Sequence, residues 1–381
     1  MKKIIVLGCT GSIGTTALSM LQSMKESIHV EGLSSNLRYG KMLSIAREFS
    51  CSCIETPVID PAFEAQCRSL GIDLYHSAEE MVSSCEADLV LNGISGAKGL
   101  EASIIALSSG KDLALANKES MVMAGPLLKA LARKHGRRII PVDSEHSAIY
   151  ELVKAFGADS IRKLIITASG GPFRCASRES LFAVTPLQAA HHPTWNMGPK
   201  ISIDCATLAN KALEVIEAGM LFDVASESIV TVIHPQSSVH SLVTLKNGQT
   251  YGQISQPSMK FPILNAILDS FGMKIDTPLC TPLLELGEEL HLDFYPMDFK
   301  RFPMVKYGYE CLSRGSFWPI LFNASNEVAV DAFRQGRIRF NQIEEIVERT
   351  LEECRFTGSP SSFEDVWNYD GLSRKLALKM I

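Results

Sequence analysis

Residues 2–14 read KKIIVLGCTGSIG, and this stretch decides the fold of the first part of the chain. The apolar run at residues 4–7 is long enough for a buried strand, and a glycine-rich turn follows it directly. Apolar and small residues then recur at helical spacing over residues 16–24. Strand, glycine turn and helix in this order are typical of a dinucleotide-binding sheet, where backbone amides approach a pyrophosphate. The spacing is G-x-x-G-x-x-G rather than G-x-G-x-x-G, so a tight turn without a ligand also stays open.

The same alternation of short apolar runs and helical segments continues to about residue 143. Further strands are predicted at residues 28–33, 53–54, 72–75, 88–92, 112–116 and 139–140. Repeated strand–helix units imply a parallel sheet that is wound in both directions, with helices on its faces. The sequence therefore predicts an α/β fold whose N-terminal part is a Rossmann-like doubly wound sheet.

The end of the second predicted strand bears on the choice of nucleotide. A site for NAD usually places an acid at this point, where it binds the ribose hydroxyls. Here Ser34, Ser35 and Asn36 end the strand, Arg38 comes two residues later, and the nearest acid, Glu31, lies inside the strand. An uncharged strand end with a base close to it favours NADP over NAD.

Two carboxylates follow the last predicted strand of this part of the chain. Asp143 and Glu145 stand one residue apart within residues 141–151, PVDSEHSAIYE. In extended backbone, residues i and i+2 point the same way, here outside the carboxyl end of the sheet, where open α/β sheets bind ligands. Two carboxylates this close repel each other unless a cation lies between them, and Mg²⁺ or Mn²⁺ suits oxygen ligands. An exposed acidic loop is the alternative.

Polar residues at two other strand–helix turns are candidates for ligand contact. Asn117, Lys118 and Glu119 follow a predicted strand and share an edge with the glycine turn, although a helix cap with solvated charges is also possible. The turn at residues 169–171, Ser-Gly-Gly, follows another strand and offers hydroxyl and backbone donors to an anion, which alone is a weak signal.

Residues 191–200, HHPTWNMGPK, have neither helical nor strand periodicity. Histidines, a tryptophan and a methionine between two prolines suit a flap over an active site better than a core segment. Trp195 could also simply pack beneath this loop.

The next predicted helix, from about Ala206 to Met220, carries a third acid. Asn210 and Glu214 share one face of this helix, and Lys211 lies three residues before Glu214. Lys211 and Glu214 could form an ordinary surface ion pair. If their face points at Asp143 and Glu145, Glu214 completes a three-carboxylate site, and Lys211 and Asn210 bind a phosphate beside it.

The remaining chain predicts a mixed sheet followed by helices. Strands at residues 163–167 and 229–234 and a hairpin at 237–254, which turns at Asn247-Gly248, form the mixed sheet. Helical stripes after residue 302 predict a small C-terminal bundle. The predicted domains are a nucleotide-binding domain at 1–143, a catalytic and dimerisation domain at 144–275 with a flap at 186–200, a linker at 276–301 and a helical domain at 302–381.

Composition limits the class of protein. A chain of 381 residues with 46% hydrophobic and 21% charged residues is ordinary globular material of two or three domains. A net charge of −5 offers no basic field for nucleic acid.

The sequence enters a strand at residue 2 and holds no apolar run of membrane-spanning length, so we expect neither a signal peptide nor a membrane span. Its 10 cysteines lack metal-site spacing, and we expect reduced thiols in a cytoplasmic protein.

Seven stretches, in chain order, resemble the 1-deoxy-D-xylulose 5-phosphate reductoisomerase family. They are GCTGSIG at 8–14, LANKES at 115–120, PVDSEHSAIYE at 141–151, SGGPFR at 169–174, HPTWNMGPKISID at 192–204, NKALEVIEA at 210–218 and VIHPQSSVHS at 232–241. The resemblance covers most of the chain. It implies a homodimeric oxidoreductase that uses NADPH and Mg²⁺ or Mn²⁺ to convert 1-deoxy-D-xylulose 5-phosphate to 2-C-methyl-D-erythritol 4-phosphate, a step of non-mevalonate isoprenoid biosynthesis.

The resemblance also implies roles for individual residues. The metal ligands would be Asp143, Glu145 and Glu214, and these acids would act in catalysis with Lys118 and His192. The substrate would contact Lys118, Ser144, Glu145, Ser169, His192, Trp195, Met197, Cys205, Asn210, Lys211 and Glu214. NADPH would contact Thr10, Gly11, Ser12, Ile13, Ser35, Asn36, Asn117, Glu119 and Gly198. Trp195 and Met197 would belong to a flap that closes over the substrate and the nicotinamide.

Two positions depart from the family pattern. The family usually has serine where this chain has Cys205, and a thiol is a weaker hydrogen-bond donor than a hydroxyl, so phosphate binding would depend more on Ser169, Asn210 and Lys211. The family often has lysine at the position of Ser35, and we expect Arg38 to replace it at the 2′-phosphate of NADP.

Two other functions stay open on the sequence. A dehydrogenase that needs no metal would keep its activity in a chelator. A catalytically silent NADP-binding protein would bind the cofactor without turnover, although three carboxylates, Lys118 and the flap together argue against silence.

Overall fold

A computed structural model describes residues 1–195, 197–274, 279–280, 284–285, 287 and 289–381. The chain forms two compact units that alternate along the sequence: unit 1 is Met1–Asn117, Leu128–Ser147 and Met259–Pro282, and unit 2 is Lys118–Leu127, Ala148–Ser258 and Leu283–Ile381. The domain bounds inferred from the sequence stay a prediction. Asn196 of the predicted flap and residues 276–278, 281–283, 286 and 288 of the predicted linker lie outside the described residues.

Unit 1 is built on a seven-stranded sheet of order β4-β3-β2-β1-β5-β6-β7. Every neighbouring pair in it is parallel. The strands are β1 (Lys2–Leu7), β2 (Ile28–Ser34), β3 (Cys53–Glu55), β4 (Asp73–Tyr75), β5 (Leu89–Asn92), β6 (Asp112–Leu115) and β7 (Ile139–Pro141). Its central strands are nearly continuous apolar runs because a parallel sheet is covered on both faces. The predicted doubly wound sheet is confirmed.

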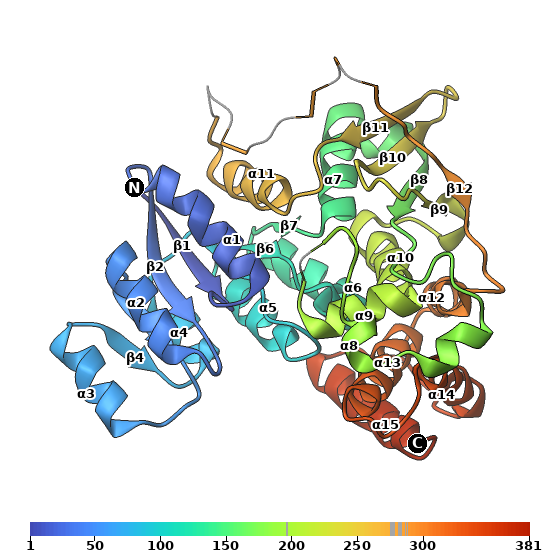
Figure 1. Cartoon of the computed structure of the whole chain (residues 1–381). Helices are drawn as coiled ribbons and strands as arrows, with labels where there is room; N and C mark the ends of the chain where they lie inside the picture. Colours follow the sequence, from blue (N-terminus) through green and yellow to red (C-terminus); the bar gives the residue numbers. More distant parts are fainter. Residues whose placement is uncertain (196, 275–278, 281–283, 286, 288) are drawn as a thin grey trace. The chain divides into compact units, whose positions relative to one another are not determined.

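Helices connect these strands and cover them (Figure 1). They are α1 (Ser12–Leu21), α2 (Tyr39–Phe49), α3 (Pro61–Ser69), α4 (Ala78–Ser84), α5 (Gly99–Ser108) and the second half of α6 (Lys118–Lys134). α4 packs on α5, and α1 packs on α11 (Lys260–Phe271), which returns from far along the sequence to contact β6 and β7.

Arg138 ties α11 to the sheet of unit 1. Its guanidinium donates to the Asp112 carboxylate at 2.7 Å and to the Ser270 carbonyl at 2.8 Å, and it reaches Asp269 at 3.3 Å. Asp112 is buried at the start of β6, so its charge needs this fixed partner. These contacts of Arg138 hold α11, which comes from far along the sequence, against the sheet of unit 1.

One pair of cysteines departs from the expected free thiols. Cys53 on β3 and Cys85 after α4 are paired as a disulfide in the structure. The expectation of reduced thiols throughout is therefore wrong for this pair, because the fold brings together two residues 32 positions apart. The other eight cysteines are free.

Unit 2 is built on a five-stranded mixed sheet of order β11-β10-β8-β9-β12. The pair β8–β9 is parallel and the other pairs are antiparallel. The strands are β8 (Ile161–Ala168), β9 (Ile229–Ile233), β10 (Val239–Leu245), β11 (Thr250–Ile254) and β12 (Tyr295–Pro296). The predicted mixed sheet and its hairpin are confirmed, whereas β12 lies in a segment that the sequence predicted as a plain connection.

The helix α10 (Ala209–Phe222) is the centre of unit 2. Val215 and Ala218 pack on the sheet, while Leu213 and Ile216 pack on the C-terminal helices. Gly308 allows the close approach of a neighbouring helix, because a Cβ there would lie 2.7 Å from the Ala212 backbone. A helix buried on all sides needs partners for every charge that it carries.

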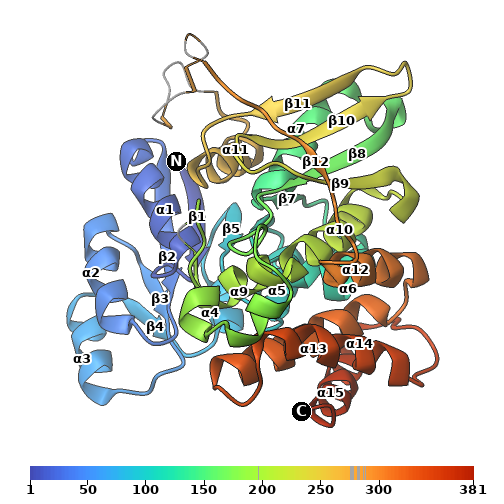
Figure 2. The ribbon, with the colours of Figure 1, turned by 45° about the vertical axis from the view of Figure 1, so that its right-hand side comes forward.

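The C-terminal helices α12 (Pro303–Arg314), α13 (Trp318–Arg334), α14 (Phe340–Glu353) and α15 (Phe363–Leu378) form a bundle, drawn in orange to red in Figure 2. α13 packs against both α14 and α15, and α12 packs against α10. The predicted C-terminal bundle is confirmed. Within the described part of the chain, no helix combines the length and the apolar character needed to cross a membrane.

Glu55 makes the stability of unit 1 depend on pH. Burial at the end of β3 raises the pKa of its carboxyl to about 7. A hydrogen bond from Ser34 lowers this pKa, but burial has the larger effect. Because the folded-state pKa lies above the unfolded one, the folded protein binds the extra proton, and stability falls as pH rises from about 4.5 through 7.

We therefore expect Glu55→Gln to raise the free energy of unfolding by up to about 3 kcal/mol near pH 8 and by much less near pH 5, measured by urea denaturation. Glu48→Gln, at an exposed position of α2, is the control and should change stability little at either pH. Equal effects of Glu55→Gln at both pH values would contradict the assignment.

Candidate active site

The glycine turn after β1 is shaped by close backbone contacts inside unit 1. Gly8 has a φ of +74°, and a Cβ there would lie 2.9 Å from the carbonyl oxygen of Gly93 in the turn after β5. A Cβ on Gly14 would lie 2.4 Å from the Gly8 oxygen, so α1 starts directly against the turn. β1 and β5 are neighbours at the point where the strand order reverses, which is where doubly wound sheets bind ligands.

The residues that the sequence assigned to the nucleotide surround this turn. Ser34 Oγ accepts from the Gly8 amide at 3.0 Å, and the hydroxyls of Thr10 and Ser35 lie 2.8 Å apart. The exposed Arg38 reaches back to the Thr10 carbonyl at 3.4 Å. Gly11, Ser12 and Ile13 form the start of α1, where amides and the helix dipole favour an anion.

Two other polar residues of unit 1 serve the scaffold in this structure. Glu31 points away from the nucleotide position because its carboxylate pairs with Lys3 at 3.1 Å. The Asn117 side chain donates to the carbonyls of Ile94 and Gly96 at 2.8 and 2.9 Å and thereby holds the turn after β5.

The backbone around Asp143 and Glu145 differs from the expected extended form. α7 (Ser144–Phe156) begins directly after Asp143, whose carbonyl accepts from the Ser147 amide at 2.8 Å. Glu145 is thus in the first helical turn, where Ser144 Oγ donates to its carboxylate at 2.6 Å. The i, i+2 argument is wrong, because α7 begins only two residues after β7 and Glu145 is therefore helical rather than extended.

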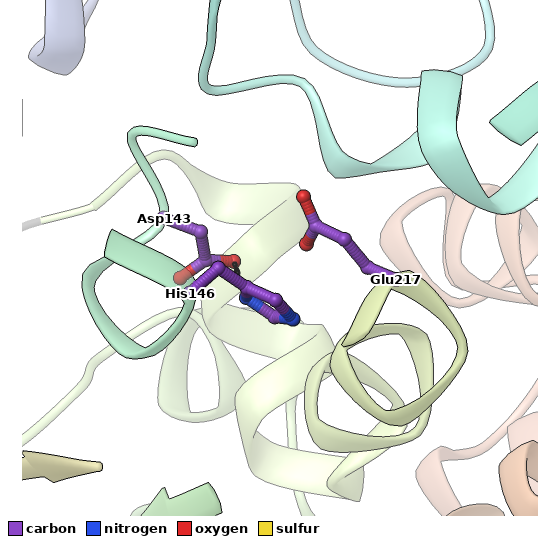
Figure 3. Close-up of side chains that lie close together, drawn as sticks. All are labelled: Asp143, His146 and Glu217. Atoms are coloured by element: carbon purple, nitrogen blue, oxygen red, sulfur yellow. Dashed lines mark ion pairs between the residues drawn. The ribbon is translucent and has the colours of Figure 1, made fainter. Parts of the chain in front are cut away.

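Figure 3 shows Asp143 immediately before the first turn of α7, His146 within that turn, and Glu217 on α10. The Asp143 carboxylate and the buried His146 ring lie 3.9 Å apart. Asp143 and Glu145 keep some exposure, whereas Glu214 and Glu217 are buried on α10. Carboxylate oxygens are the ligands that a divalent cation prefers, and each unit carries such groups: Asp143 and Glu145 in unit 1, Glu214 and Glu217 in unit 2.

In unit 2, Glu214 holds two buried ammonium groups. Lys118, in the first turn of α6, donates to the Asn210 side chain at 2.8 Å and to Glu214 at 3.3 Å. Lys211 donates to the other oxygen of Glu214 and to the Thr167 carbonyl, the latter at 2.5 Å. These contacts place four of the predicted site residues, Lys118, Asn210, Lys211 and Glu214, in one cluster at the end of β8.

A second cluster of unit 2 joins the turn after β8 to the predicted flap. His192 Nδ1 accepts from the amides of Thr194 and Trp195 at 3.2 and 3.0 Å, so Nε2 carries the proton and donates to Ser169 Oγ at 3.1 Å. The same hydroxyl accepts from the Gly171 amide at 3.2 Å. This histidine therefore acts as a neutral donor here and fixes one end of the flap.

The other end of the flap is helical, which the sequence did not predict. α9 (Pro199–Thr207) begins at Gly198, and Leu208, with a φ of 58°, separates it from α10. The predicted helix start near Ala206 is therefore wrong. A proline directly after glycine was the signal, but α9 lacks an amphipathic stripe because its charged residues Lys200 and Asp204 face other charges inside unit 2.

Cys205 lies on α9 against the turn after β8. A Cβ on Gly171 would meet the Cys205 carbonyl oxygen at 2.5 Å, so only glycine permits this approach. Burial raises the pKa of the Cys205 thiol, which stays a neutral, weak donor. Met197, two residues before α9 in the sequence, is half-buried.

Comparison with known proteins gives the family. The 1-deoxy-D-xylulose 5-phosphate reductoisomerase model matches residues 4–125, and two models of reductoisomerase C-terminal domains match residues 139–222 and 254–376. A 1-deoxy-D-xylulose 5-phosphate reductoisomerase of Treponema denticola is 42% identical over 100% of this chain and 97% of its own length. The chain belongs to the 1-deoxy-D-xylulose 5-phosphate reductoisomerase family.

Solved reductoisomerase structures share the fold. A crystal structure of DOX-P reductoisomerase in complex with NADPH, fosmidomycin and magnesium has a TM-score of 0.92 at 33% identity and covers 100% of this chain and 98% of that one. The Zymomonas mobilis reductoisomerase in complex with NADPH has a TM-score of 0.89 at 35% identity, with the same coverage of both chains. The resemblance found in the sequence is confirmed.

One contact of this reductoisomerase was not foreseen from the sequence. The Glu119 carboxylate, assigned to NADPH by resemblance, pairs with Lys200 at 2.6 Å. Burial alone would raise the pKa of the Glu119 carboxyl. The charge and hydrogen bond of Lys200 outweigh burial and hold that pKa below its usual value. No sequence spacing signals the pair, because the two residues lie 81 positions apart.

The cluster around Glu214 makes a prediction for stability. Glu214→Leu leaves two buried ammonium groups without their shared carboxylate, so we expect the free energy of unfolding to fall by about 3–5 kcal/mol in urea denaturation. Glu310→Leu, which removes the exposed partner of Lys306 on α12, is the matched control and should cost under about 1 kcal/mol. Similar losses for both variants would show that the Glu214 cluster is solvated.

Proposed function

We propose that this reductoisomerase converts 1-deoxy-D-xylulose 5-phosphate to 2-C-methyl-D-erythritol 4-phosphate with NADPH and a divalent metal, through the residues described above. The observation that carries the proposal is that the whole chain, rather than the nucleotide-binding part alone, matches the family. Related structures are named as complexes with NADPH, with fosmidomycin and with magnesium. The product places the enzyme in the biosynthesis of isoprenoid precursors.

For the metal, we assign Asp143, Glu145 and Glu214 as ligands. Carboxylate oxygens are the donors that Mg²⁺ and Mn²⁺ prefer, and the resemblance to the family assigns these three acids to the metal. A bound divalent cation would polarise the substrate carbonyl and a neighbouring hydroxyl. In the structure, the Glu214 carboxylate is paired with Lys118 and Lys211.

For the cofactor, we assign the glycine turn and the strand ends beside it. The site would comprise Thr10, Gly11, Ser12, Ile13, Ser35, Asn36, Asn117, Glu119 and Gly198. The amides at the start of α1 would bind the pyrophosphate, and Arg38, beside Thr10, would pair with the 2′-phosphate in place of the family's usual lysine. Asn117 would act mainly by holding the turn after β5, and Glu119 through its backbone, since its carboxylate binds Lys200.

For the substrate, we assign the two clusters of unit 2 together with the start of α7. Lys118, Asn210 and Lys211 would donate to substrate oxygens, and Ser169 and His192 would bind the phosphate with support from Cys205. The remaining substrate contacts would come from Ser144, Glu145, Glu214, Trp195 and Met197. Lys118 would stabilise the oxyanion that develops as the carbon skeleton rearranges, and NADPH would then supply hydride to the aldehyde.

The flap would exclude water from this aldehyde. Its segment between α8 (Pro186–Ala189) and α9 carries His192, Trp195 and Met197, two of which have apolar side chains suited to cover a nicotinamide. Closing such a segment prevents escape and hydrolysis of a reactive intermediate.

The assay that tests the function measures NADPH oxidation with 1-deoxy-D-xylulose 5-phosphate, with and without Mg²⁺, for the wild type, Glu214→Gln and the control Glu310→Gln. We expect turnover that needs the metal, that falls by about a hundredfold or more in Glu214→Gln, and that is unchanged in Glu310→Gln. NADH in place of NADPH should react poorly.

Each contrary outcome identifies another function. Turnover that ignores both chelation and Glu214→Gln would indicate a dehydrogenase without a metal. Binding of NADPH without any turnover would indicate a silent cofactor-binding protein.

We also propose a cytoplasmic homodimer. Unit 2 exposes apolar side chains along β11 and around β12, among them Ile254 at 44%, Phe294 at 44% and Tyr295 at 52%. β11 and β12 are the two edge strands of this sheet, and exposed apolar groups on an edge strand fit a contact with a second copy of the chain. Sedimentation at micromolar concentration should give twice the chain mass of 41.8 kDa, and a single-chain mass would contradict the dimer.

A further inference from the structure

Lys200 stands between two carboxylates at the start of α9. Its ammonium lies 2.6 Å from Glu119 Oε1 and 2.9 Å from Asp204 Oδ2. The two acids are almost fully buried, with side-chain exposures of 8% and 1%, while the Lys200 side chain is 20% exposed. One cation thus joins the first turn of α6 to α9 within unit 2.

The contacts of Lys200 continue into the C-terminal helices. Asn326 of α13 donates to the second oxygen of Asp204 at 2.9 Å, and both residues are buried. The next residue of α13, Glu327, pairs with Arg374 of α15 at 2.6 Å. Its charge also acts on Lys200. The position of the ammonium is therefore fixed from α6 and from the bundle at the same time.

The partner of Lys200 on α6 is the residue next to Lys118. Glu119 and Lys118 share the first helical turn, and Lys118 donates in the other direction, to Asn210 and Glu214 of α10. A shift of this turn would move the Lys118 ammonium relative to Glu214. Lys200 holds this turn through Glu119, the residue that follows Lys118.

Lys200 is also the last residue of the predicted flap and the second residue of α9. The preceding end of the flap rests on the bundle by apolar contact, since Ala189 is buried in a core with Phe333 and Ile343, and Val184 packs against it. The following end rests on the bundle through Lys200 and Asp204. Both ends of the flap are thus anchored on the C-terminal helices.

The charge of Lys200 does not change near neutral pH. Burial alone would lower the pKa of its ammonium, but Asp204 and Glu119 outweigh burial and raise that pKa above its usual value. An ammonium whose pKa is raised stays protonated at neutral pH and cannot accept a proton there. Lys200 therefore acts through position rather than as an acid or base.

We propose that Lys200 is a positioning residue of the reductoisomerase, which fixes Lys118 relative to the flap by holding Glu119 and Asp204 against the C-terminal helices. This inference rests on the proposed function, and it gives the bundle a role in the reaction. The alternative is a buried ion pair that stabilises the fold without setting the geometry of the reacting groups.

Lys200→Met tests the proposal, because methionine keeps much of the length and removes the charge. We expect kcat to fall on the order of tenfold to a hundredfold while the protein stays folded, since a displacement of about 1 Å in a catalytic group has an effect of that size. Lys200→Arg should recover most of kcat. Lys306→Met, which breaks an exposed ion pair on α12, is the matched control and should keep the wild-type kcat.

A double-mutant cycle separates positioning from simple stabilisation. If Lys200 acts through Glu119, the double variant Lys200→Met with Glu119→Gln should be no slower than the slower single variant. Losses in kcat that multiply would overturn the proposal. So would a kcat for folded Lys200→Met within threefold of that of Lys306→Met, even if its urea midpoint has fallen.

A measurement without turnover keeps this test separate from the test of function. Amide hydrogen exchange in the wild type and in Lys200→Met should be faster in the variant over residues 118–123 and 199–204, with exchange in α14 unchanged. Unchanged exchange at the start of α6 would overturn the positioning role whatever the activity. Absence of wild-type turnover would reject the proposed function alone.

Discussion

Two buried ammonium groups share one carboxylate, and the arrangement of unit 2 depends on this constraint. Lys118, Lys211 and Glu214 are each at most 6% exposed. Because water cannot solvate these charges, each of them needs its partner. Lys118 comes from α6, the other two from α10, and the Thr167 carbonyl that receives Lys211 ends β8. Three elements are therefore fixed by electrostatics at the point where the reacting groups are needed.

The same principle recurs around the site, with different surroundings. In unit 1, Arg138 binds both α11 and the buried Asp112 of β6, and in unit 2, Lys200 joins α9 to the buried Glu119 of α6. In each case one long basic side chain joins segments that are distant in sequence. Apolar packing fills the interior, but these charges determine which helices occupy which places.

The sequence predicted most of the scaffold because its signals are local. Apolar runs located the strands of both sheets, and the glycine turn after β1 marked the point where the strand order reverses. The geometry at Asp143 and Glu145 was missed because α7 begins directly after Asp143, only two residues beyond β7, so that Glu145 is already helical. α9 was missed because its charged residues are buried against partners, which removes the periodicity that identifies a surface helix. The pairs Glu119–Lys200 and Cys53–Cys85 have no local signal, since tertiary packing alone creates them.

The alternation of the two units along the chain has a consequence for how the protein can be altered. Each unit is assembled from three separate stretches, so five junctions connect them, and two of these fall inside the helices α6 and α7. The unit that carries the glycine turn is thus not one continuous stretch that recombination could exchange for that of another oxidoreductase. Such an exchange would need cuts at all five junctions, two of them within helices.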